Sequence, residues 1–144
     1  MINSFNNYLK QGKVKKKTYD FEEAKALFEK AKNRIKYTKS RKLSIGSAQF
    51  ILEDSYEAIR ESAQALMSIN GYKPYSHEST ISFIKEFYNS KFTEEEIHKF
   101  DRFRQLRNNS IYKAEAVSLE DAKDCIYFAI GFIKKIKSIL KVKK

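Results

Sequence analysis

Turn-forming residues are scarce in this chain, and that scarcity limits the folds open to it. Only four glycines and one proline occur in 144 residues. A fold with many strands needs a tight turn after nearly every strand, and glycine and proline are among the residues best suited to such turns. The sequence therefore predicts a protein that is nearly all helix. At this length we expect one domain with a sizeable core.

Hydrophobic residues at spacings of three and four predict five helices, each with a readable start signal. The helices begin at or near Asp20, Ser47, Ser76, Thr93 and Ser118. The first fades near Ser40. The second reaches Ile69 before a left-handed stop at Asn70-Gly71, and it should be the long spine of the domain. Thr93 and Glu96 form a capping box for the helix over residues 94–112.

The last predicted helix carries an apolar face that is broader than one neighbouring helix needs. Its apolar residues are Leu119, Ala122, Cys125, Ile126, Phe128, Ala129, Phe132, Ile133, Ile136, Ile139 and Leu140. Two interpretations account for this breadth. The helix is either the central helix of a bundle or the surface of a dimer.

Arg107 stands where the helix over residues 94–112 would place a core side chain. The apolar stripe of that helix consists of Ile97, Phe100, Phe103, Leu106 and Ile111. Arg107 falls near the middle of the stripe, with Arg104 beside it. A guanidinium cannot lose its proton, so it must find partners there or reach a water-filled cleft. Arg107 is therefore either a functional cation or a structural arginine paired with a carboxylate on a neighbouring helix.

Positive charge gathers at both ends of the chain, and the net charge is +11. Residues 1–43 hold 13 Lys/Arg against 4 Asp/Glu, residues 44–112 hold 8 against 10, and residues 113–144 hold 8 against 4. Such a field attracts phosphate polyanions without sequence specificity, so nucleic acid is a plausible partner. The lysine-rich ends could equally serve solubility alone. No bulky apolar face adjoins the lysines near residue 15, so we expect no membrane binding.

Cysteine content and hydropathy indicate the compartment. Cys125 is the only cysteine, which excludes an intramolecular disulfide and suits a reducing cytoplasm. No stretch approaches 18 uncharged apolar residues, so we expect a cytoplasmic protein without a membrane span. The sequence has no glycine-rich phosphate loop and no cysteine-histidine metal spacing, and we expect no cofactor and no metal.

Five short segments, taken in order, resemble a known family. They are Tyr56–Arg60, Gly71–Pro74, Ser76–Glu78, Leu106–Asn108 and Ser118–Ala122. Together they resemble the HEPN superfamily in its small prokaryotic and archaeal form. The resemblance implies an all-α, up-and-down bundle of four to five helices over residues 20–144, with residues 1–19 as a basic N-terminal extension. It also implies a homodimer in which the arginine helices face a shared cleft.

What the resemblance implies for activity is a metal-independent ribonuclease. Its active site pairs an arginine and a polar neighbour with a histidine four to six residues downstream. Arg107 and Asn108 match the first half, but Tyr112 stands five residues after Arg107, where the family has histidine. The resemblance therefore makes Arg107, Asn108 and Tyr112 catalytic candidates. Arg104, Arg107 and Lys113 are the substrate-binding candidates.

The missing histidine separates two functions. A phenol, with a reference pKa of about 10, is a poor base near pH 7. His98 precedes Arg107 on the same helix and points away from it, and His77 could approach only through tertiary folding. We therefore favour a HEPN-like RNA- or nucleotide-binding module that is weakly active or inactive as a nuclease. The alternative is a HEPN ribonuclease toxin of a toxin-antitoxin pair, with a nucleotidyltransferase partner.

Overall fold

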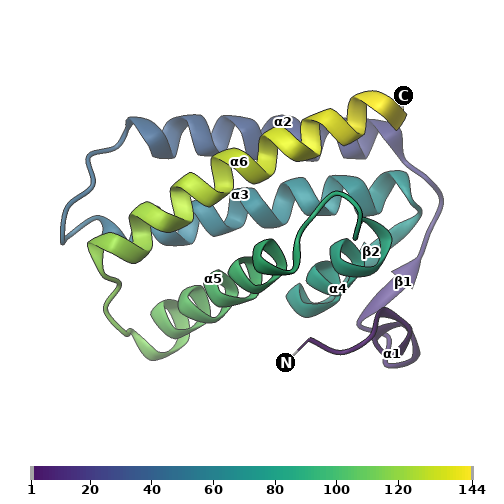
Figure 1. Ribbon diagram of the computed structural model, residues 1–144, viewed down its shortest axis with the longest axis horizontal. Coiled ribbons are helices and arrows are strands. Elements are labelled where there is room, and N and C mark those ends of the chain that lie inside the picture. The colour runs from purple at the N-terminus through teal and green to yellow at the C-terminus, as the bar shows by residue number, and fades with distance from the viewer. Residues whose placement is uncertain (1, 144) are drawn as a thin grey trace.

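The computed structural model describes residues 2–143, with side chains up to residue 141, and over that range it holds six helices and one two-stranded ribbon (Figure 1). The elements are α1 (Phe5–Lys10), β1 (Val14–Lys16), α2 (Phe21–Ser40), α3 (Ala48–Ile69), β2 (Tyr72–Pro74), α4 (His77–Phe87), α5 (Glu94–Lys113) and α6 (Leu119–Lys143). The predicted all-α class is confirmed. None of these helices combines the length and apolar character that crossing a bilayer requires.

The long helices run alternately up and down, as Figure 1 shows: α2 and α5 point one way, α3 and α6 the other. Helix α3 is their centre, because α2 and α6 pack along it while α4 and α5 cover its remaining sides. Of its 22 residues, 15 are buried. The spine predicted from Ser47 to Ile69 is thus confirmed.

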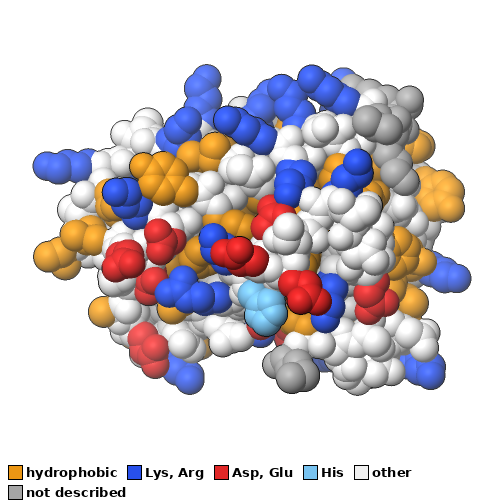
Figure 2. Space-filling view, viewed as in Figure 1, with side chains coloured by type: hydrophobic (Ala, Val, Ile, Leu, Met, Phe, Trp, Pro, Cys, Tyr) orange, Lys and Arg blue, Asp and Glu red, His pale blue; other side chains and the backbone are white. Residues whose placement is uncertain are grey.

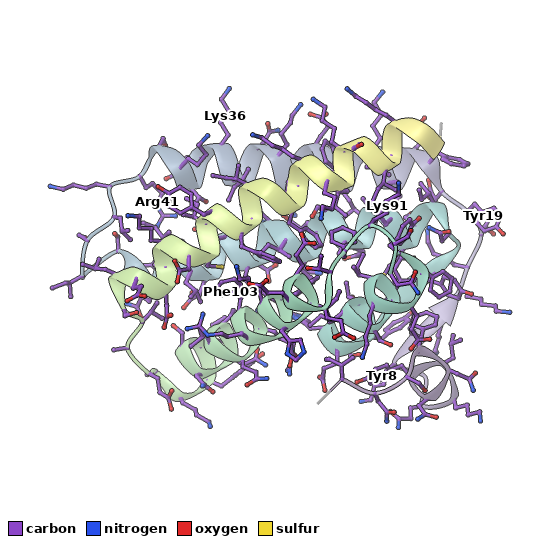
Figure 3. The ribbon with its side chains drawn as sticks, in the orientation of Figure 1. Tyr8, Tyr19, Lys36, Arg41, Lys91 and Phe103 are labelled. Carbon is purple, nitrogen blue, oxygen red and sulfur yellow. The ribbon has the colours of Figure 1, made fainter. Side chains whose placement is uncertain are left out.

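The broad apolar face of α6 packs inside this bundle. Ala122, Cys125 and Ile136 are fully buried on α6, which contacts both α3 and α2. Phe103 of α5 points into the same interior, whereas Lys36 of α2 points to solvent (Figure 3). One of the two interpretations offered for the last helix was that it is the central helix of the bundle. Helix α3 occupies that position instead.

Three predicted helix starts are formed by local hydrogen bonds. The Asp20 carboxylate accepts from the third backbone N–H of α2 at 2.9 Å, and the Ser76 hydroxyl does the same for α4 at 3.1 Å. Thr93 and Glu96 form the predicted capping box, each side chain accepting from the backbone N–H of the other. Because each cap satisfies otherwise unpaired helix donors, these boundaries could be predicted from short sequence patterns.

The N-terminal segment contains two elements that the sequence analysis did not predict. Strand β1 pairs with β2 in antiparallel register, Val14 opposite Pro74. Helix α1 packs on α4, where the ring of Phe5 lies 5.8 Å from that of Phe83 and 5.2 Å from that of Phe87. Phe5 and Val14 are 3% and 1% exposed. Residues 2–19 are therefore folded onto the bundle.

We expect Phe5→Ala to destabilise the protein by about 3–5 kcal/mol, since truncating a buried phenylalanine removes apolar contacts and leaves a cavity. Asn6→Ala, an exposed neighbour on the same helix, is the matched control and should change stability little. Urea denaturation followed by circular dichroism measures both. Equal stabilities of the two variants would show that α1 is dispensable for the fold.

Candidate functional site

Arg107 lies at the edge of the core, on the side of α5 that faces α3. The buried positions of α5 are Ile97, Phe100, Phe103 and Ser110. Ile111, which was predicted to continue the apolar stripe, is 43% exposed, so that prediction is wrong. The buried face passes through Ser110, whose hydroxyl donates to Glu53 of α3 at 2.8 Å. The Arg107 side chain is 17% exposed and thus reaches both protein and solvent.

The guanidinium of Arg107 has few partners for its degree of burial. One Nη atom lies 3.6 Å from a carboxylate oxygen of Glu57, and the other donates to the Asn108 side-chain oxygen at 3.2 Å. The guanidinium carbon stands 6.0 Å from the centre of the Tyr56 ring. Nε is buried without a hydrogen-bond partner within residues 2–143. Protein groups therefore satisfy only part of this cation.

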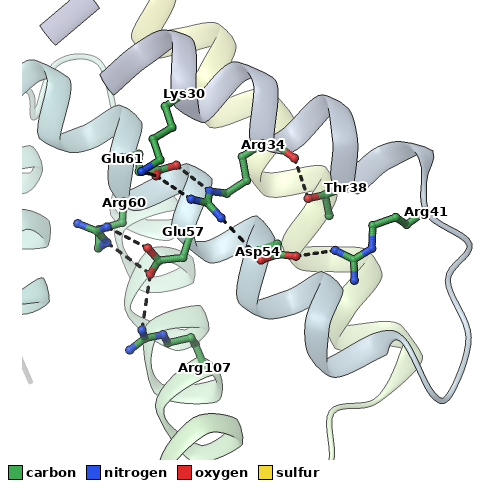
Figure 4. Close-up of polar contacts among 9 residues, drawn as sticks. All are labelled: Lys30, Arg34, Thr38, Arg41, Asp54, Glu57, Arg60, Glu61 and Arg107. Carbon is green, nitrogen blue, oxygen red and sulfur yellow. Dashed lines mark hydrogen bonds and ion pairs between the residues drawn. The ribbon is translucent and has the colours of Figure 1, made fainter. Parts of the chain in front are cut away.

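Glu57 is shared between two arginines, as Figure 4 shows. Arg60, one turn further along α3, donates to Glu57 at 2.9 Å. Burial by itself would raise the pKa of the Glu57 carboxyl, but the hydrogen bond from Arg60 and the charges of Arg60 and Arg107 hold the pKa below its ordinary value. One carboxylate thus faces two guanidinium groups, which leaves an excess of positive charge at this place.

Tertiary folding brings His77 of α4 to the same cluster. Its Nδ1 is hydrogen-bonded to the Tyr56 hydroxyl at 2.9 Å, and the two rings stack with centroids 5.6 Å apart. Burial, followed by the positive charges of Arg60 and Arg107, lowers the pKa of His77 to about 4. The imidazole is therefore neutral at pH 7. His98 is exposed and lines a separate hollow with Lys85 and Asn89.

The other predicted site residues are placed differently. Arg104 is already paired, with Asp101 at 2.8 Å and with Glu78 of α4 at 3.9 Å. Tyr112 is 75% exposed near the end of α5, and Lys113 is also exposed. In the part of the chain that the structure describes, no hydrogen bond, ion pair or ring contact joins either to Arg107. Residues five apart on a helix point about 140° away from each other, so this separation follows from helix geometry.

An ion-pair ladder between α2 and α3, not predicted from the sequence, lies beside the site (Figure 4). Arg34 donates two hydrogen bonds, at 2.9 and 3.0 Å, to Glu61, which is 2% exposed. Lys30 also pairs with Glu61, and Arg41 pairs with Asp54. The sequence holds a signal for this ladder, since the acids of α3 recur every three to four residues on one face and so do several of the bases of α2.

The basic field is spread over several surfaces. Figure 2 shows Lys and Arg side chains along one edge of the molecule, over α2 and the later part of α6. Lys13, Lys15 and Lys16 are exposed, whereas Lys17 pairs with Glu23 at 3.2 Å. The side chain of Lys143 and all of Lys144, which end the C-terminal lysine run, lie outside the described residues.

The depressed pKa of His77 predicts a pH-dependent stability. Its value in the folded protein, about 4, lies below the ordinary 6.5, so between these values the unfolded chain binds more protons. The free energy of unfolding should therefore rise with pH between about 4 and 6.5. Above that range the neutral His77 should contribute its full stabilisation. His77→Gln, which keeps a hydrogen-bonding group for Tyr56, should remove that part of the dependence. Urea unfolding of both proteins from pH 4 to 7 measures it, and parallel curves would contradict the assignment.

Comparison with known proteins identifies the family. The family model described as HEPN domain matches residues 24–139. No curated protein matches the sequence. The matched range begins in α2 and ends in α6, so it contains Arg107 and every residue of its cluster, and it leaves α1 and β1 outside. A match over well more than half of the sequence, on a helical bundle of this order, shows that the chain belongs to the HEPN domain family, a family generally related to nucleotides and RNA.

Proposed function

We propose that this HEPN domain binds phosphate groups of RNA at Arg107 and Arg60, and that its nuclease activity is weak or absent. The observation that carries the proposal is the incomplete pairing of Arg107. The guanidinium of Arg107 lies 3.6 Å from the carboxylate of Glu57, which also pairs with Arg60. The Nε of Arg107 has no hydrogen-bond partner in the described chain. Arg34, by contrast, makes two short hydrogen bonds to Glu61. A purely structural arginine would be expected to resemble Arg34.

A phosphate would complete the pairing of this cluster. Two guanidinium groups face one carboxylate, and phosphate oxygens accept several charge-assisted hydrogen bonds from such planar donors. Glu57 supports the site by orienting both arginines without cancelling both charges. The exposed lysines of the N-terminal segment add a longer-range attraction for the RNA backbone.

We expect Arg107→Ala to weaken RNA binding about 10- to 100-fold, because a hydrogen bond to a charged group contributes about 1.5–3 kcal/mol. The fold should survive, since Glu57 keeps Arg60 as a partner at 2.9 Å. Fluorescence anisotropy with labelled RNA measures the affinity, and thermal melting measures the stability.

Two arginine variants serve as controls for this experiment. Arg102→Ala removes an equal charge from a 52%-exposed position of the same helix and should leave affinity close to that of the wild type. Arg34→Ala breaks the pairing of the buried Glu61 and should cost stability, up to about 3–5 kcal/mol. If Arg107→Ala lowered the melting temperature as Arg34→Ala does while RNA binding stayed intact, Arg107 would be structural.

A second candidate function is a metal-independent HEPN ribonuclease toxin with a nucleotidyltransferase partner. The observation that favours it is the position of His77, which lines a pocket with Arg60 and is hydrogen-bonded to Tyr56, whose ring centre lies 6.0 Å from the guanidinium carbon of Arg107. A neutral imidazole can accept the proton of a ribose 2′-hydroxyl while an arginine stabilises charge on the phosphate. In this reading His77 replaces the histidine that the local motif lacks at Tyr112.

Cleavage assays in EDTA separate the two candidates. We expect little or no cleavage by the wild type. If cleavage occurs, His77→Ala should reduce its rate about 10²–10⁴-fold, the usual contribution of a positioned acid-base group, whereas Tyr112→Phe should not. Loss of cleavage in Tyr112→Phe alone would return the catalytic role to Tyr112 and remove His77 from the mechanism.

We further propose that the protein acts in the cytoplasm as a homodimer. Support comes from exposed apolar side chains around the connection between α5 and α6, close in sequence to Arg107. These are Ile111, Tyr112 and Leu119. A two-fold interface there would shield them from water and bring two α5 helices together. Light scattering should give twice the chain mass of 16.9 kDa, and a concentration-independent monomer would reject the dimer.

A further inference from the structure

The β1–β2 ribbon presents an exposed aromatic ring beside two lysines. Tyr75, which directly follows β2, is 55% exposed. The Nζ atoms of Lys15 and Lys73 lie 5.3 and 5.5 Å from the centre of its ring. Neither lysine pairs with a carboxylate anywhere in the described part of the chain. We call Tyr75, Lys15 and Lys73 the Tyr75 platform.

Antiparallel pairing holds the platform in place. Lys15 lies directly opposite Lys73, and opposed residues of an antiparallel pair project from the same face. Tyr75 follows Lys73 by two residues, which places it on that face too. Its N–H donates to the backbone oxygen of Lys13 at 2.8 Å. Val14, on the opposite face, is buried against the bundle, so the ribbon is anchored to the core.

The platform borders the arginine cluster. A pocket of about 230 Å³ is lined by Pro74 and Tyr75 at the ribbon, by Ser76, His77 and Thr80 of the cap and helix α4, and by Arg60 of α3. Arg60 in turn meets Arg107 on Glu57. Among the described residues no carboxylate lines this pocket, and Glu78, the next residue after His77, faces Arg104 at 3.9 Å. A surface rich in positive charge thus leads from the ring to the proposed phosphate site.

We infer that the Tyr75 platform stacks an unpaired base of single-stranded RNA while a neighbouring phosphate occupies the pocket at Arg60. The inference rests on the proposed function and specifies its substrate class. An aromatic ring next to cations that track the backbone is the usual means of holding single strands without sequence preference. The bases of a duplex are stacked on each other, so a duplex offers no free base face to Tyr75. The two lysines have flexible, exposed side chains, which can move aside to contact phosphates.

The test compares three ligands: an octamer of adenylate, the same backbone with abasic nucleotides, and a short RNA duplex. Tyr75→Ala should weaken binding of the adenylate octamer about tenfold and leave the abasic and duplex ligands unchanged. Tyr75→Phe keeps the ring and should bind as the wild type does. Tyr127→Ala is the matched control, since Tyr127 is 62% exposed and also has a lysine over its ring, 5.9 Å from Lys123. Fluorescence anisotropy gives the affinities, and 2-aminopurine in the octamer reports stacking directly.

Each outcome bears on the inference. Selective loss of octamer binding in Tyr75→Ala, with loss of 2-aminopurine quenching, supports it. If Tyr75→Ala binds the octamer as Tyr127→Ala does, or loses affinity equally for the abasic ligand, the platform is not a stacking site. In that case weakened binding by Arg107→Ala would still support the proposed function. Failure of the wild type to bind any of the three RNAs would overturn both.

Discussion

Burial of α3 on nearly every side governs what its charged residues can do. A carboxylate removed from water must be paired, and α3 carries several of them close to the core. Glu61, at 2% exposed, is enclosed by Arg34 and Lys30 of α2. Glu57 is paired by Arg60 and by Arg107 of α5. The need to pair these buried carboxylates thus holds α2 against α3, and it also directs the guanidinium groups of Arg60 and Arg107 toward Glu57.

The two carboxylates differ in how completely hydrogen bonds satisfy them, and the proposed function rests on this difference. Glu61 accepts a bidentate pair of short hydrogen bonds from Arg34, which is the geometry of a stable contact between helices. Glu57 accepts one short hydrogen bond, at 2.9 Å, from Arg60 on its own helix, and its contact with Arg107 is longer, at 3.6 Å. Arg107 is therefore aligned by the fold but keeps donor capacity for another anion. His77, held neutral beside it, does not add to the positive charge.

Features that depend on neighbouring residues in the chain could be predicted from the sequence, and features that depend on tertiary contacts could not. The caps at Asp20, Ser76 and Thr93 were predicted because each forms within one helical turn. The position of Arg107 beside the core followed from helical spacing, although Ile111 turned outward. Strand β1 was missed because it has three residues and one buried side chain.

The approach of His77 to Tyr56 joins two helices, and the local sequence of neither indicates it. The family motif directed attention to Tyr112, five residues from Arg107, whereas a histidine from another helix lies near the cluster. Spacing within α5 describes only one wall of the site. The other walls come from α3 and α4, so a prediction that used α5 alone could name the arginine but not its surroundings.

Strand β1 pairs with β2, which lies almost sixty residues later in the sequence, so the N-terminal segment cannot fold until that later part has been synthesised. Phe5 and Val14 leave the ribosome before α3, β2 and α4, which supply their partners, have been synthesised. At about 5–20 residues per second, the N-terminal segment waits several seconds with its apolar side chains uncovered. Its lysines keep that waiting segment strongly charged and soluble. Because like charges repel, the lysines of this segment oppose its association with other unfinished chains during that interval.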